Sequence, residues 1–146
     1  MDRDICKISF VAMATGEDLV LTVSLDGHPF FEQTLPAGQP QRVEYQFREH
    51  DGQQHQLVLE MSGKTDQHTR VDSQGTILED RVIQIRDFAL DEIELGHLFH
   101  SKSRYQHNFN GHGPDTDAQF WGDMGCNGIV TLEFTSPAYL WLLEHT

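Results

Sequence analysis

The chain has 146 residues and a net charge of −13, from 10 Lys and Arg against 23 Asp and Glu. Such an acidic surface repels phosphate, so nucleic acid and anionic membranes are poor partners, while cations, basic proteins and neutral ligands such as sugars remain open. The length predicts one domain over residues 1–146, and no apolar run approaches the roughly 18 residues of a membrane span.

The first half of the chain alternates apolar and polar residues with a period of two. This pattern predicts half-buried strands over residues 6–14 and 19–25. Asp26-Gly27 follows the second strand at once and predicts a two-residue hairpin turn, because both positions tolerate a positive φ. Pro29 cannot donate to a ladder, so the strand after this turn is expected at the edge of a sheet.

The next alternating runs, over residues 43–47 and 57–61, lie on either side of the turn sequence at 50–53 and predict a second hairpin. Residues 82–90 also predict a strand. Its apolar phase changes between Ile85 and Phe88, which predicts a β-bulge near residues 86–87.

The pattern of apolar residues changes from strand to helix near the end of the chain. The last clean strand pattern covers residues 130–134, and residues 137–144 predict a short helix with Ser136 as its N-cap. Trp141 belongs to the apolar pattern of this helix and is expected to pack in the core. With one helical pattern confined to the C-terminus, the sequence predicts an all-β fold: an antiparallel β-sandwich (jelly roll) with a short C-terminal helix.

The chain carries none of the common catalytic signatures. The patterns G-x-S-x-G and H-E-x-x-H and the phosphate-binding loop are absent, so no enzyme is predicted. The charged start of the chain predicts no secretory signal. Cys6 and Cys126 lie at opposite ends of this unexported chain and are expected to be buried thiols rather than a disulfide.

A polar segment over residues 62–80 carries the first candidate site. Calcium takes six to eight oxygen ligands, and several acids around Gly75 could supply them. The best candidate ligands are Asp72, Glu79 and Asp80. The alternative is a solvated acidic hairpin on an already acidic protein.

The irregular stretch over residues 97–127 carries two more candidates. The first candidate is a group of four histidines, whose imidazoles suit a transition metal (His97, His100, His107 and His112). No thiolate or acid at motif spacing completes a ligand set. The alternative is that these histidines are exposed or hydrogen-bonded. Aromatic faces among amides and glycines suit a sugar, whose C–H faces stack on rings. The candidate ligand-binding residues are Trp121, Tyr105, Phe120 and Asn110. The alternative is that Trp121 fills the core.

Two segments resemble the small calcium-dependent carbohydrate-binding modules of the xylan-binding kind. Residues 21–27 (LTVSLDG) match that family's V-x-L/V-D-G turn, and residues 80–91 (DRVIQIRDFALD) are similar to its D-R-N-L-x-V-D strand, with Val82 in place of Asn. The resemblance implies a jelly-roll sandwich that binds sugar hydroxyls partly through a bound calcium ion.

Residues 64–80 also resemble small β-sandwich proteins of tailed bacteriophages. Their pattern K-T-x-x-D-T-x-V-D-x-x-G-x-I-x-x-D is matched except at His68. Taken together, the resemblances predict a non-catalytic binding and assembly module carried on a phage virion, with itself, other virion proteins and a glycan as partners. The alternative is a purely structural virion subunit, such as a capsid decoration or tail protein, that binds no sugar.

Overall fold

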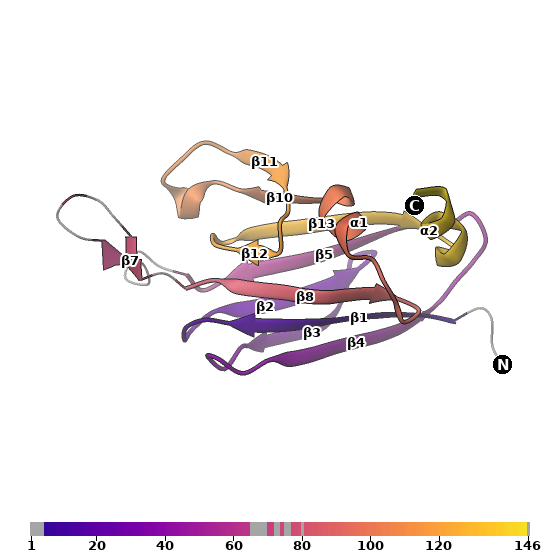
Figure 1. Ribbon diagram of the computed structural model, residues 1–146, viewed down its shortest axis with the longest axis horizontal. Helices are drawn as coiled ribbons and strands as arrows, with labels where there is room; N and C mark the ends of the chain where they lie inside the picture. The colour runs from indigo at the N-terminus through magenta and orange to yellow at the C-terminus, as the bar shows by residue number, and fades with distance from the viewer. Residues whose placement is uncertain (1–4, 65–69, 72–73, 75–76, 80, 146) are drawn as a thin grey trace.

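The computed structural model describes residues 5–64, 70–71, 74, 77–79 and 81–145, and these form two antiparallel sheets packed face to face (Figure 1). The first sheet has the strand order β12-β8-β1-β4, with β9 beside β8. Its strands are β1 (Ile5–Ala14), β4 (Gln41–Arg48), β8 (Ile83–Leu90), β9 (Ile93–Glu94) and β12 (Asp123–Met124).

The second sheet has the order β11-β10-β13-β5-β2-β3. Its strands are β2 (Val20–Leu25), β3 (His28–Thr34), β5 (Gln54–Ser62), β10 (Ser103–His107), β11 (Thr116–Gln119) and β13 (Gly128–Thr135). A separate hairpin of β6 (Arg70–Val71) and β7 (Ile77–Glu79) extends from one end of the sandwich, between β5 and β8 (Figure 1). The predicted β-sandwich is confirmed, and the helices α1 (His97–Lys102) and α2 (Ala138–His145) are short.

The period-two pattern places the core between the sheets. Every second residue of β1 is fully buried, and β2 repeats this arrangement. Between them the sheets enclose a single apolar cluster, because antiparallel strands covered on one face bury alternate side chains. The strands predicted over residues 6–14 and 19–25 are therefore confirmed.

The predicted turn after β2, the edge strand that follows it and the bulge in β8 are also confirmed. Asp26 and Gly27 have φ angles of 52° and 83° and join β2 to β3. Pro29 lies on β3, which is an edge strand that pairs only with β2. The bulge in β8 is present, since Ser9 faces Ala89 while Val11 faces Arg86, and Asp87 adopts a φ of 58°.

The second predicted hairpin is wrong. β4 pairs with β1 in the first sheet, whereas β5 lies between β13 and β2 in the second. The turn at residues 50–53 therefore carries the chain from one sheet to the other. The turn sequence predicts only that the chain reverses direction. A reversal occurs both in a hairpin within one sheet and in a crossing between two sheets.

The predicted cap of α2 is wrong as well. The Ser136 hydroxyl lies 2.6 Å from His55 Nε2 and does not cap the helix. Instead Glu49 accepts a hydrogen bond of 2.7 Å from the Ala138 amide, so a carboxylate from a distant loop satisfies the start of α2. The helix packs Trp141, which is 5% exposed, against Phe134, which confirms its core role.

The prediction of a buried thiol is confirmed for Cys6 alone, and the two cysteines form no disulfide. Cys6 is buried, and Cys126 is only half-buried. Among the described residues no helix is long and apolar enough to cross a membrane.

Candidate functional site

Trp121 is the most exposed large apolar side chain of the described residues, at 71%. It lies in the connection between β11 and β12. The preceding Phe120 is fully buried and packs edge-on against Tyr105 and Phe99, with ring centroids 5.8 Å apart in both pairs. Because Phe120 anchors the backbone, Trp121 is held outward, where its ring stacks at 6.2 Å and 30° on His100 of α1.

Gly122 allows a charged pair to approach Trp121. Its φ is 107°, which L side chains rarely adopt, and a Cβ there would lie 2.9 Å from Arg86 Nη1 and would displace that group. The Arg86 guanidinium donates to the carbonyl of Gly122 at 2.9 Å and to Asp123 Oδ1 at 2.8 Å. The pair Arg86–Asp123 is therefore tied to the backbone directly after Trp121, although both side chains are half-exposed.

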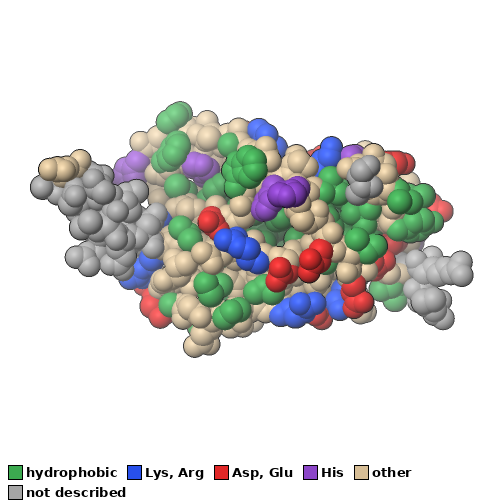
Figure 2. All heavy atoms as spheres, in the orientation of Figure 1, with side chains coloured by type: hydrophobic (Ala, Val, Ile, Leu, Met, Phe, Trp, Pro, Cys, Tyr) green, Lys and Arg blue, Asp and Glu red, His purple; other side chains and the backbone are tan. Residues whose placement is uncertain are grey.

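We call Trp121, His100, Arg86 and Asp123 the Trp121 surface. A depression of about 130 Å³ lies beside it, lined from β8 and α1 and including Asp87 and Glu94. Figure 2 shows hydrophobic, basic, acidic and histidine side chains mixed on the face over β8 and α1. An aromatic face next to a fixed donor and acceptor can bind a polyhydroxylated ring, and the surrounding acids disfavour an anionic ligand.

Two of the predicted ligand-binding residues, Tyr105 and Phe120, lie in the core. Tyr105 is 8% exposed, and its hydroxyl donates to the Cys126 carbonyl and accepts from the Cys126 amide at 2.8 Å. Burial raises the pKa of this phenol above its ordinary value. Tyr105 and Phe120 pack in the core, so neither can present a ring face, and the prediction of a platform is corrected to Trp121 alone.

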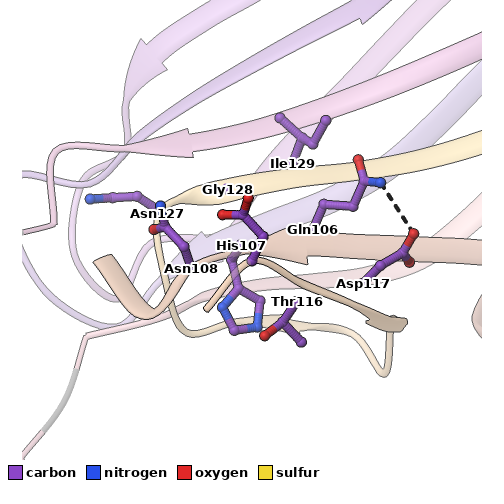
Figure 3. Close-up of a pocket in the computed structure, with 9 residues that line it drawn as sticks. Gln106, His107, Asn108, Thr116, Asp117, Asn127, Gly128 and Ile129 are labelled. Atoms are coloured by element: carbon purple, nitrogen blue, oxygen red, sulfur yellow. Dashed lines mark hydrogen bonds between the residues drawn. The ribbon is translucent and has the colours of Figure 1, made fainter. Parts of the chain in front are cut away.

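Asn110 lies elsewhere, in a tight turn after β10. It has a φ of 59°, and its side-chain oxygen accepts from the Asn127 amide at 2.8 Å. Asn127 in turn lines a groove of about 460 Å³ (Figure 3). The groove is lined by Gln106, His107, Asn108, Asp115, Thr116, Asp117, Asn127, Gly128 and Ile129. Asn110 therefore holds the backbone of Asn127 at this groove but is not itself one of its lining residues.

Within the described part of the chain, the four predicted histidines do not gather into a group that could hold a metal ion. Among the described residues one group of three ligand atoms lies within 4.8 Å, and it consists of Cys6, Glu49 and Asp91. Burial, reinforced by both carboxylates, raises the pKa of the Cys6 thiol far above its ordinary value. A protonated thiol is a poor partner for calcium, which prefers oxygen, so this group does not fit that ion.

The predicted calcium ligands fall largely outside the described residues. Asp72 and Asp80 lie there, as does the side chain of Glu79. The backbone of Glu79 belongs to β7, where it pairs with Arg70 of β6. The expected excursion between two strands is thus a hairpin in its described part.

Asp26, His55 and Ser136 are arranged like a hydrolase triad. His55 Nδ1 lies 2.7 Å from Asp26 Oδ2, and its Nε2 lies 2.6 Å from the Ser136 hydroxyl. A nucleophile also needs access and donors for an oxyanion. Ser136 is 4% exposed, its own amide bonds to Gln53, and the nearby Ala138 amide is taken by Glu49. The three residues therefore act as a structural link between β2, β5 and β13, which sequence spacing could not reveal.

Comparison with known proteins adds the fold relationship. No family model and no curated protein matches the chain. Its structure is similar to vCBM60, a calcium-dependent carbohydrate-binding module, with a TM-score of 0.52 at 9% identity over 87% of this chain and 89% of that one. It is also similar to vCBM60 in complex with galactobiose, with a TM-score of 0.50 at 11% identity over 86% of this chain and 96% of that one. The chain therefore has the sandwich fold of a carbohydrate-binding module.

Proposed function

We propose that the chain is a non-catalytic module that binds a neutral glycan on the Trp121 surface. The observation that carries this proposal is the ring of Trp121, which is 71% exposed and is followed in the chain by the hydrogen-bonded Arg86–Asp123 pair at Gly122. An exposed indole offers a flat apolar face that can stack on the C–H face of a sugar ring. The fold shared with carbohydrate-binding modules supports the same conclusion.

The arrangement suggests how a sugar would be held. The indole face would cover the apolar C–H face of a pyranose ring, and its edge hydroxyls would bond to Arg86 and Asp123. Because both partners already hold each other at 2.8 Å, little side-chain freedom is lost on binding. A net charge of −13 favours neutral over acidic sugars.

The test is a glycan array followed by calorimetry with galactobiose and xylo-oligosaccharides. Trp121→Ala should abolish binding, whereas Tyr139→Ala should leave it unchanged. Tyr139 is a matched control because it is another exposed aromatic, at 56%, on α2. An array without hits for the unmodified protein overturns the proposal, as does equal loss in both variants.

Calcium is the second part of the proposal. The ion would sit in the 66–80 segment, with Asp72, Glu79 and Asp80 as its ligands, and the calcium dependence of the similar module supports this idea. An ion that binds only the folded state raises the melting temperature. Equal melting curves in calcium and in chelator would contradict it.

We further propose that the module is carried on a phage virion, where it contacts other virion proteins and copies of itself. This location is supported only by the sequence pattern over residues 64–80. Mass spectrometry of purified particles tests it, and a protein missing from particles but present in the lysate contradicts it. A virion protein that binds no glycan on the array would favour the purely structural role.

A further inference from the structure

The outward face of the second sheet carries a groove longer than the one in Figure 3. The 460 Å³ cavity near residues 106–117 shares Gln106 and Asp117 with a second cavity of about 270 Å³. That cavity shares Gln56 and Glu133 with a third of about 490 Å³, which reaches α2. The three cavities adjoin one another through these shared walls, and together we call them the sheet groove.

Strand register explains this continuity. Gln106 of β10 lies between Asp117 of β11 and Ile129 of β13, and Arg104 lies opposite Thr131. Alternate residues of a strand face the same side, so β13 contributes an outward row at positions 129, 131, 133 and 135. Six residue steps along a strand span about 20 Å, which is long enough for several sugar units.

Part of the floor of the groove is polar and is held in place by hydrogen bonds. Asp117 accepts from Arg104 Nε at 2.8 Å and from Gln106 Nε2 at 3.2 Å. The Arg104 hydrogen bond, helped by Gln106, lowers the pKa of Asp117 below its ordinary value, so this acceptor stays charged at neutral pH. The remaining donors and acceptors of this network face outward, where hydroxyl groups can bond to them.

A protein partner fits this floor poorly. The cores of protein interfaces are rich in aromatic and apolar side chains. The apolar residues that line the groove are half-buried or buried (Ile129, Phe134 and Trp141), and none of the large exposed apolar residues of the described part of the chain lines it (Ile5, Ile93, Phe109, Trp121, Tyr139, Leu140 and Leu143). Hydroxyl groups of a sugar chain can instead bond to the polar side chains of the groove.

We infer that the sheet groove is a second glycan-binding site, which takes an extended neutral polysaccharide chain along β13. This inference rests on the proposed function and extends it from one sugar platform to a preference for long chains. Contacts spread along the groove add binding free energy with each further sugar unit.

The test compares oligosaccharides of two and six units, from xylan and from galactan, by calorimetry. The unmodified protein should bind six units at least about tenfold more tightly than two. Thr131→Trp fills the middle of the groove and Gln106→Ala removes one of its polar groups, and each should erase most of this gain. Gln46→Ala is the control, because it removes an exposed glutamine from β4 of the other sheet.

The outcomes separate the two sites. Equal affinity for two and six units, or a gain that survives Thr131→Trp and Gln106→Ala, overturns the groove and leaves the Trp121 surface intact. No binding of either length overturns the proposed function and the groove together. Amide shifts at residues 104, 106 and 131 on adding six units support the groove, whereas shifts confined to residues 86, 100 and 121–123 contradict it. An extended peptide that competes for the groove better than any glycan also overturns it.

Discussion

The two tryptophans occupy opposite environments although each follows an apolar residue. Trp141 is 5% exposed and lies where α2 meets Phe134, while Trp121 is 71% exposed. The difference comes from what anchors the backbone on either side. Glu49 fixes the start of α2 and turns Trp141 inward, whereas buried Phe120 and tightly packed Gly122 turn Trp121 outward. The side chain of Trp141 thus contributes to the core, whereas the β11–β12 connection leaves the indole of Trp121 in solvent.

The largest effect on stability is expected from removing the Trp141 side chain from the contact between α2 and the core. Trp141→Ala should lower the free energy of unfolding by about 3–5 kcal/mol, because the cavity left by a buried aromatic cannot fully collapse. Urea unfolding followed by circular dichroism measures the loss. The folded fraction should still bind glycan, and a loss below about 1 kcal/mol would contradict the core role.

The second-largest effect on stability is expected from the buried hydrogen bonds that join Asp26, His55 and Ser136. Ser136→Ala leaves His55 Nε2 without its partner and should cost about 1–3 kcal/mol, the range for an unsatisfied buried polar group. A fluorophosphonate probe should not label Ser136 in the folded protein. Labelling that Ser136→Ala removes would instead make the triad catalytic.

The Cys6 thiol should produce a smaller, pH-dependent effect. Its pKa in the folded state is raised above the ordinary 9.0, so the stability it contributes is complete below that pH and is lost as the pH rises further. Stability should fall by at most about 1.4 kcal/mol per pH unit above this point. Cys6→Ala should flatten the fall between pH 9 and 10. An unchanged slope in that variant would assign the fall to other groups, such as the buried Tyr105 phenol.

Much of the sandwich could be predicted because burial between two sheets imposes a period of two. The alternation in β1 and β2, the Asp26-Gly27 turn and the bulge near Asp87 all follow from local rules of backbone and burial. The crossing at residues 50–53 could not be predicted, since a reversal of the chain says nothing about which sheet receives the next strand.

The candidate site was predicted less completely, because it too depends on contacts between residues far apart in the sequence. Short strands such as β10 and β11 have too few residues to show a period, so the sequence did not separate buried Tyr105 and Phe120 from exposed Trp121. The partners of Trp121 come from distant positions, with Arg86 on β8 and His100 on α1. Glu49 likewise caps a helix that begins 89 residues later, beyond any local capping rule.

The smallest effect on stability should accompany the largest effect on binding. Trp121→Ala removes a ring that already lies in water, so the free energy of unfolding should change by no more than about 0.5 kcal/mol. Glycan retention on an affinity gel should nevertheless disappear, because the stacking face is gone. Trp121→Phe keeps a smaller aromatic face and should restore part of the retention, which a merely structural role would not produce. If Trp121→Ala unfolds the protein instead, the stacking on His100 belongs to the core, and the contrast between the two tryptophans is wrong.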